Sequence, residues 1–284
     1  MQKLLNQLLK AHFITREGST LPELWRQAEL NEQLYWAQLF SSATLQLFDG
    51  ALMCALPQHD ILAYNRVIGL SQLPDLANRQ LQIIAKRYQE LGSKRFMVQL
   101  ADSPALSLLR PILETHDLKQ HNLWHKLGCD LSKLEIEAPI IKNLEVKRIN
   151  RDEASLFGAL VAQIFDWPSD IAQLYAQTIE APGYLHWMAF IKQQPVGLAS
   201  MYCGPMAASL SIGGTLAGFE GRGIQKALIK TRLIEAKALG YQHVFTETGA
   251  DTSEKPNWSY RNLLRCGFEK LYDRINFVRE TAEG

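Results

Sequence analysis

The stretch Gly218-Phe219-Glu220-Gly221-Arg222-Gly223-Ile224-Gln225-Lys226-Ala227-Leu228 lies between a strand-like run and a helical run. Glycines at such a junction let the backbone approach a ligand closely and present successive N–H groups. The N-terminus of the following helix adds N–H donors and the positive end of a dipole, so the junction suits a phosphate or a diphosphate. Arg222 and Lys226 would add full positive charges. A plain tight turn before a helix has the same glycine pattern, so the flanking sequence must decide between the two interpretations.

Two familiar phosphate-binding loops do not match this stretch. A Walker loop needs lysine directly after its last glycine, but Ile224 and Gln225 intervene here. The dinucleotide-binding fingerprint needs glycine or alanine where Lys226 stands, and it needs a parallel βαβ unit.

The flanking sequence predicts an antiparallel meander with a βα crossover, in the order βααβββαβαβ. The expected strands are 145–149, 185–192, 196–203, 209–216, 243–248 and 268–278, and the expected helices are 152–165, a stretch ending near 180, 223–239 and 259–266. Gln193-Gln194-Pro195 is expected to form a hairpin turn. The predicted fold class is α+β, with mostly antiparallel twisted sheets flanked by helices.

These features together resemble the GNAT acetyltransferase superfamily. The G-R-G-I turn with its alanine-leucine pair resembles that family's acyl-CoA pyrophosphate motif, and Ser259 to Phe268 resembles its second motif, a short helix ending in Gly-Phe. The resemblance covers roughly Glu145 to Val278. It implies that the amides of the turn hold the coenzyme A diphosphate and that the preceding strand edge pairs with the pantetheine arm. The implied cofactor-binding residues are Thr215, Leu216, Ala217, Gly221, Arg222, Gly223, Ile224, Gln225, Lys226, Ser259 and Asn262.

The sequence departs from the family pattern at four positions. Glu220 stands where the family usually has Arg or Gln, and Gln225 stands where it usually has Gly or Ala. The usual acid tyrosine falls on Leu263. The usual asparagine falls on Pro256, with Asn257 one residue late. These departures concern the chemistry more than the binding of coenzyme A.

Acyl transfer to an amine needs a base for the amine and an acid for the leaving thiolate. Glu247 is the predicted base, because it ends an otherwise apolar strand at the edge where open sheets place ligand crevices. An exposed strand-end carboxylate is the competing interpretation. Tyr260 and Tyr272 are the two candidates for the acid, although either could be a half-buried packing residue.

The first half of the chain can be aligned with the second. Leu91-Gly92 precedes the expected strand 95–100 as Leu239-Gly240 precedes 243–248, an offset of 148 residues, and a later pair of landmarks is offset by 150. We therefore expect a degenerate GNAT-like domain at 1–128, a linker at 129–144 containing Pro139, and an acyl-CoA-binding domain at 145–284. Gly69 to Pro74 stands at the first copy's turn without repeated glycine or basic residues, so a cofactor-free structural copy is expected.

Composition excludes several other classes of protein. The formal net charge of +1 gives no one-signed footprint for nucleic acid, and no apolar run is long enough for a membrane span. Leu4, Leu5, Leu8 and Leu9 fit an amphipathic helix. The four cysteines, Cys54, Cys129, Cys203 and Cys266, are too far apart for a zinc site or a disulfide framework, so a cytoplasmic location is expected.

Other conspicuous residues receive structural roles. His116, His121 and His125 lack a carboxylate to complete a ligand set, and we expect no metal. The charged residues of the helix after the turn, Arg232 among them, are expected to face solvent.

The sequence thus predicts an acyltransferase that moves an acetyl or short acyl group from acetyl-CoA, its co-substrate, to an amine, with a small-molecule acceptor favoured over a protein. The alternative is a non-catalytic acyl-CoA-binding sensor or regulatory module. A third alternative, an interaction protein that has lost the cofactor, is disfavoured by the intact Gly221-Arg222-Gly223. The sequence names neither the acceptor nor an oligomeric state.

Overall fold

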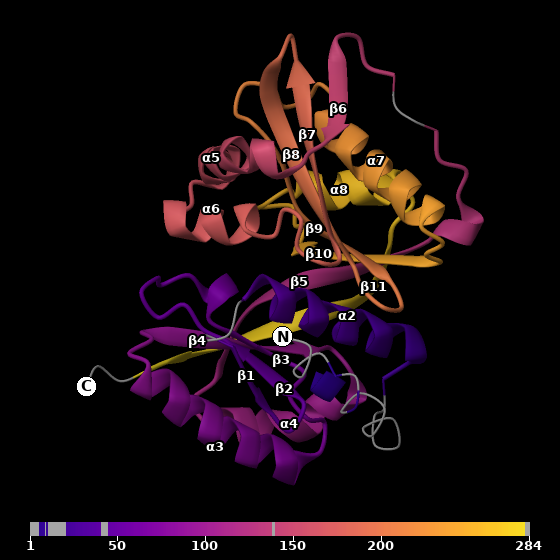
Figure 1. Ribbon diagram of the computed structural model, residues 1–284. Helices are drawn as coiled ribbons and strands as arrows, with labels where there is room; N and C mark the ends of the chain where they lie inside the picture. Colours follow the sequence, from indigo (N-terminus) through magenta and orange to yellow (C-terminus); the bar gives the residue numbers. More distant parts are fainter. Residues whose placement is uncertain (1–5, 9, 11–20, 41–44, 138–139, 282–284) are drawn as a thin grey trace. The chain divides into compact units, whose positions relative to one another are not determined.

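The computed structural model describes residues 6–8, 10, 21–40, 45–137 and 140–281 (Figure 1). Leu4, Leu5, Leu9 and Pro139 lie outside the described residues, whereas Leu8 is buried. Within these ranges, no helix combines the length and the apolar character needed to cross a bilayer.

The chain forms two compact units. Unit 1 comprises Met1–Lys126 together with Leu271–Gly284, and unit 2 comprises Leu127–Lys270. The sequence-based division instead assigned 145–284 to one domain and 129–144 to a linker. In the structure a strand continues to Asp130 and a 3-10 turn follows at Leu131–Lys133, so the start of the expected linker has regular structure.

Unit 2 contains the elements expected around the glycine-rich turn, and their order is confirmed. They are β6 (Leu144–Arg148), a 3-10 turn (Arg151–Glu153), α5 (Ala154–Phe165), α6 (Ser169–Ala176), β7 (Tyr184–Ile191), β8 (Gln194–Cys203), β9 (Ala208–Thr215), α7 (Ile224–Ala238), β10 (His243–Gly249) and α8 (Trp258–Arg265).

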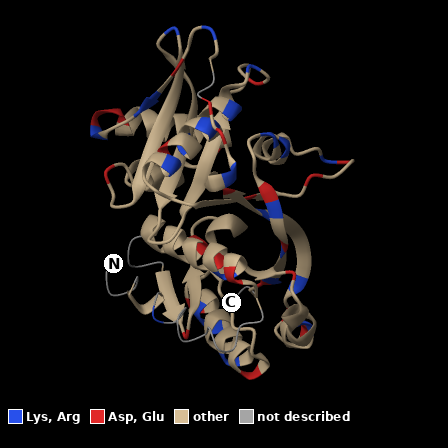
Figure 2. Ribbon diagram, turned by 90° about the vertical axis from the view of Figure 1, so that its right-hand side faces the viewer, with Lys and Arg blue, Asp and Glu red and all other residues tan. Residues whose placement is uncertain are grey.

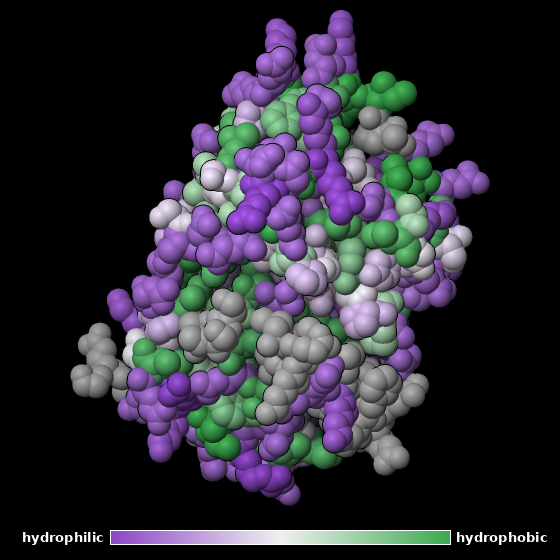
Figure 3. Space-filling model, in the orientation of Figure 1, coloured by the Kyte–Doolittle hydropathy of each residue, from purple (hydrophilic) through white to green (hydrophobic). Residues whose placement is uncertain are grey.

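The strands of unit 2 follow the order β6-β7-β8-β9-β10. Neighbours from β6 to β9 are antiparallel, and β9 and β10 are parallel. The β7–β8 hairpin turns at Lys192-Gln193, one residue before the expected position, and both residues have positive φ (48° and 67°). Two central residues with positive φ form the turn whose twist matches the strands. Hydrophilic side chains cover this end of the hairpin (Figure 3).

Unit 1 repeats part of this order. Its elements are α2 (Glu23–Leu39), β1 (Leu45–Phe48), β2 (Ala51–Cys54), a 3-10 turn (Leu62–Tyr64), β3 (Arg66–Ile68), α3 (Pro74–Glu90), β4 (Arg95–Ala101), α4 (Pro104–Thr115) and most of β5 (Lys119–Asp130). The offsets are confirmed, since β10 begins 148 residues after β4 and β11 (Glu269–Glu280) begins 150 residues after β5.

The C-terminal strand completes the sheet of unit 1. β11 pairs antiparallel with β4 from Arg274 opposite Ala101 to Glu280 opposite Arg95, giving the order β1-β2-β3-β4-β11-β5 (Figure 1). This pairing explains why the last residues group with unit 1. Periodicity cannot reveal such a partner, because it reports only the local conformation of a strand.

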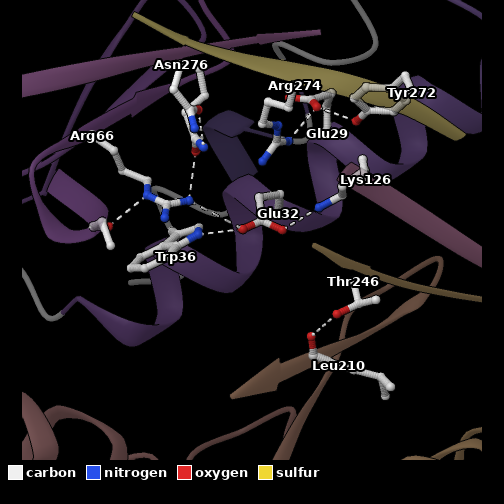
Figure 4. Close-up of polar contacts among 12 residues, drawn as sticks. Glu29, Glu32, Trp36, Arg66, Lys126, Leu210, Thr246, Tyr272, Arg274 and Asn276 are labelled. Carbon is white, nitrogen blue, oxygen red and sulfur yellow. Dashed lines mark hydrogen bonds and ion pairs between the residues drawn. The ribbon is translucent and has the colours of Figure 1, made fainter. Parts of the chain in front are cut away.

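One face of the sheet of unit 1 carries a buried charge network beneath α2 (Figure 4). Glu32 accepts hydrogen bonds from Lys126 Nζ and Trp36 Nε1, both at 2.6 Å, and Arg66 Nη1 lies 3.9 Å from the same carboxylate. Burial alone raises the pKa of Glu32, but Lys126, Arg274 and Arg66 hold it at about 2. The opposite face packs an apolar core against α3 and α4.

Charges of both signs occur along both units. In Figure 2, blue Lys and Arg segments are interspersed with red Asp and Glu segments.

Candidate active site

β9 and β10 separate soon after they begin. They pair at Ala208 with Val244 and at Ser209 with Phe245. One residue further along, Thr246 Oγ1 donates to Leu210 O at 3.1 Å (Figure 4). A cavity of about 170 Å³ opens beyond this contact, between strand residues 210–213 and 246–247 and side chains of α7 and α8. Its floor is therefore made of strand residues of β9 and β10 that are not paired with each other.

A β-bulge in β9 lies beside this cavity. The register with β8 shifts so that Ser211 and Ile212 lie opposite Ser200. Arg232 donates from Nη1 to Ser200 O at 2.9 Å and from Nε to Leu228 O at 3.1 Å. The bulge turns the backbone of β9 locally, and Arg232 satisfies the carbonyl opposite it.

The expectation that Arg232 faces solvent was wrong. Its exposed fraction is 3%, and burial lowers its pKa to about 9. Arg232 lies four residues after Leu228 and four before Ala236, both of which are buried. That spacing places it on the core-facing stripe of α7, and the spacing was the signal that could have identified it.

The glycine-rich turn has the backbone conformation that only glycine adopts without strain. Gly218, Gly221 and Gly223 have φ of 84°, 74° and 80°, and Gly223 is the N-cap of α7. Within the described residues, the N–H groups from Gly221 to Gln225 donate no hydrogen bond. Five N–H groups at one helix N-terminus are thus available to an anion.

The two cations of the turn have no acidic partner in the described part of the chain. Arg222 donates from Nη2 to Gly218 O at 3.2 Å, and its guanidinium lies 4.9 Å from the centre of the Phe219 ring. Lys226 is exposed. Both charges remain available to a ligand at the turn.

The end of β9 keeps one edge free for a ligand. Leu216 N donates to Val196 O at 2.8 Å, on the side of β8. Thr215 Oγ1 is buried and has no hydrogen-bond partner among the described residues. Ala217 is exposed.

Three of the predicted cofactor-binding residues contact one another. Gln225 Nε2 donates to Ser259 Oγ at 3.2 Å, and Asn262 Nδ2 donates to Gln225 Oε1 at 2.6 Å. These bonds join the first turn of α7 to α8, so the two motifs identified in the sequence form one wall of the cavity.

Glu247 lies on β10, half-buried, and lines the cavity. Tyr260 lies on α8, half-buried, and packs against the core of unit 2. The start of α8 is fixed by Asn257, which accepts from Tyr260 N at 3.1 Å and donates to Gly249 O at 2.7 Å. Asn257, which lies one residue after the position of the family's usual asparagine, therefore joins α8 to the end of β10.

The structure does not place Tyr272 at this cavity. Tyr272 belongs to unit 1, where its hydroxyl donates to Glu29 (Figure 4). Its ring lies 4.5 Å from that of Trp25. Burial, followed by the charge of Glu29, raises the pKa of Tyr272 well above its ordinary value. β11 enters unit 1 at Leu271. Tyr272 therefore lies in unit 1, although it follows the second motif closely in the sequence.

No group of three or more potential metal ligands occurs among residues 6–8, 10, 21–40, 45–137 and 140–281. His121 and His125 lie on β5, and His125 Nδ1 lies 2.7 Å from Asp273 Oδ1. His116 Nε2 lies 2.7 Å from Asn78 Oδ1.

Comparison with solved structures identifies this architecture. A GCN5-related N-acetyltransferase from Kribbella flavida matches with a TM-score of 0.64, at 14% identity over 91% of this chain and 94% of that chain. One from Sphaerobacter thermophilus matches with a TM-score of 0.61, at 13% identity, covering 82% and 78% of the two chains. The chain has the GNAT fold. A tandem GNAT protein from the clavulanic acid biosynthesis pathway matches with a TM-score of 0.59, at 9% identity over 77% and 75%.

No protein-family model and no curated protein matches the sequence significantly. The GNAT fold is therefore recognised through its geometry and its few turn residues. Within this GNAT fold the departures noted in the sequence have local explanations. Glu220 accepts from Gly218 N at 2.7 Å, Gln225 links α7 to α8, and Leu263 is buried in the core of unit 2.

Proposed function

We propose that the protein transfers an acetyl or short acyl group from acyl-CoA to the amine of a small molecule, with unit 2 as the catalytic unit. The observation that carries this proposal is the set of free N–H groups from Gly221 to Gln225, next to the cavity that Glu247 lines. A diphosphate requires several convergent donors, and this turn offers them together with Arg222 and Lys226.

Acetyl-CoA fits this site as a co-substrate in two places. Its diphosphate would lie at the N-terminus of α7. Its pantetheine arm carries amide groups that can pair with an unpaired strand edge, and β9 offers such an edge beside β10. Thr215 Oγ1 is a buried hydroxyl without a partner there.

Glu247 is proposed as the base. An amine with a pKa near 10.4 costs about 4.6 kcal/mol to deprotonate at pH 7, so a carboxylate beside the acceptor lowers the barrier considerably. Tyr260 is retained as the proposed acid for the leaving thiolate, because it begins the helix that carries Ser259 and Asn262. Tyr272 is not retained, because its hydroxyl is engaged by Glu29.

Titration calorimetry of the full chain with acetyl-CoA tests the binding step, and we expect one site per chain. Thiol release from acetyl-CoA, with and without a library of small amines, tests the transfer step. Binding at one site without amine-dependent thiol release would favour the sensor module instead. Absence of acetyl-CoA binding would exclude both functions.

A further inference from the structure

Unit 1 has a cleft at the same place in the repeat as the cavity of unit 2. β3 and β4 pair in parallel from Arg66 opposite Met97 to Ile68 opposite Gln99, and the chain then turns away at Gly69, which has a φ of 79°. Gln99 stands 148 residues before Glu247, and each of these two side chains lines the cavity of its own unit.

The cavity of unit 1 is the larger of the two, at about 360 Å³ against about 170 Å³. Leucines dominate its lining and come from β4, from the turn after β3 and from three helices, among them Leu30, Leu70, Leu76, Leu100, Leu106 and Leu109. A concave apolar pocket of this volume with a few polar groups is typical of a small-molecule site.

The turn of unit 1 offers fewer donors to a diphosphate than the turn of unit 2. Ser71 N donates to Gln80 Oε1 at 2.9 Å, and Leu73 N donates to Ser71 Oγ at 3.1 Å. Pro74 opens α3 and has no N–H. Two donors of this turn are therefore satisfied within the unit and a third is missing, so a phosphate-bearing ligand gains less there than at the turn of unit 2.

The polar groups that line the cavity favour a neutral ligand that accepts a hydrogen bond. Gln33 donates to Gly50 O at 2.8 Å and to Ile68 O at 3.1 Å. Glu29 accepts from Arg274 and Tyr272. Arg26 Nε is buried without a hydrogen-bond partner among the described residues, while Arg26 Nη2 is paired with Glu23. One free N–H on a charge-balanced side chain suits a carbonyl oxygen rather than a second anion.

We propose that unit 1 binds a neutral, apolar carbonyl compound, of the acyl-amide class, with its hydrocarbon part among the leucines and its carbonyl oxygen on Arg26 Nε. The degenerate copy is then a second ligand site with a chemistry different from that of unit 2. This proposal does not depend on the activity of unit 2.

The test uses the full chain and the neutral fluorescent probe N-phenyl-1-naphthylamine, displaced by octanamide. Leu76→Trp should fill the cavity, and we expect it to weaken octanamide binding tenfold or more. Leu108→Trp is the matched control, because Leu108 lies on α4, is 61% exposed and does not line the cavity. The Leu108→Trp variant should bind octanamide with an affinity within twofold of that of the unmodified chain. Arg26→Met should weaken octanamide about fivefold while leaving the affinity of the probe unchanged.

Thermal unfolding of each variant checks that it is folded. The proposal is overturned if octanamide fails to displace the probe, or if a folded Leu76→Trp variant binds as tightly as the unmodified chain. Displacement of the probe by acetyl-CoA would also overturn it, because the turn of unit 1 would then accept a diphosphate.

Discussion

The junction between β9 and α7 in unit 2 and the junction between β3 and α3 in unit 1 occupy the same place in a repeated order of elements. In unit 2 five consecutive N–H groups are free, and two cations stand beside them without acidic partners in the described chain. In unit 1 Gln80 and Ser71 accept from the turn, and Pro74 removes a donor. A cavity lies beside the junction in each unit, so the difference at the turn lies in which groups it leaves unsatisfied.

The two junctions therefore share the order of their elements and differ in how many backbone donors they leave unsatisfied. In unit 1, side chains that accept hydrogen bonds from the turn leave fewer donors for an anion, while the order of the elements is kept. The same comparison places Gln99 in unit 1 where unit 2 has Glu247.

The strongest test of the comparison removes the charge that distinguishes these two equivalent positions. Glu247→Gln gives unit 2 the residue type of unit 1, and we expect turnover with a responsive amine to fall about a hundredfold, because a general base contributes in the chemical step. Thiol release measures turnover, and calorimetry should show acetyl-CoA affinity nearly unchanged. Glu254→Gln is the matched control, since Glu254 is exposed and does not line the cavity. Turnover within twofold of the unmodified chain would show that Glu247 is not the base.

The next test closes the turn of unit 2 itself. Gly223→Val adds a branched side chain at a φ of 80°, 3.1 Å from Ile141 Cδ1 at its Cβ, and should weaken acetyl-CoA tenfold or more, about 1.4 kcal/mol. Gly240→Val is the matched control, because Gly240 has a φ of 85° at the other end of α7. If a folded Gly223→Val variant keeps full affinity while Gly240→Val does too, the turn is not part of the site.

The smallest expected effect is a change in stability with pH, because each unit buries a titratable group with a shifted pKa. In unit 2, His186 lies between Ser200 Oγ (2.7 Å) and Thr178 Oγ1 (3.1 Å), and burial lowers its pKa to about 4 from an ordinary value of 6.5. Its stabilising contribution is complete above pH 6.5 and is lost as the pH falls towards 4. We expect the free energy of unfolding to fall by about 1 kcal/mol between pH 6 and pH 5.

Urea unfolding at the two pH values measures this change. In the His186→Asn variant the free energy of unfolding should differ less between pH 6 and pH 5. In unit 1 the pKa of Glu32 is lowered from 4.5 to about 2, so its contribution is lost only between those values. An equal loss of stability in the His186→Asn variant between pH 6 and pH 5 would remove His186 as the cause.

Much of the fold could be predicted from the sequence, because the signals are local. Alternating apolar residues in strands, the periodicity of α7 and the glycines of the turn each report the conformation of their own segment. The bounds of β4 and β10 agree with the expected strands within a residue. Gln225, Ser259 and Asn262 could be proposed as site residues for the same reason, since each belongs to a motif of contiguous residues, and the structure shows that they contact one another through Gln225.

The sequence by itself determined the elements, their repetition and the glycine turn with its charges. Tertiary structure alone decided that β11 completes unit 1, and this removed Tyr272 from the candidate site residues. It also decided that Arg232 is buried against the carbonyl opposite a bulge, and that the turn of unit 1 satisfies two of its own donors. The physical reason is the same in each case. Strand pairing and hydrogen-bond satisfaction join groups far apart in the chain, and no periodicity within a segment records which distant partner will be used.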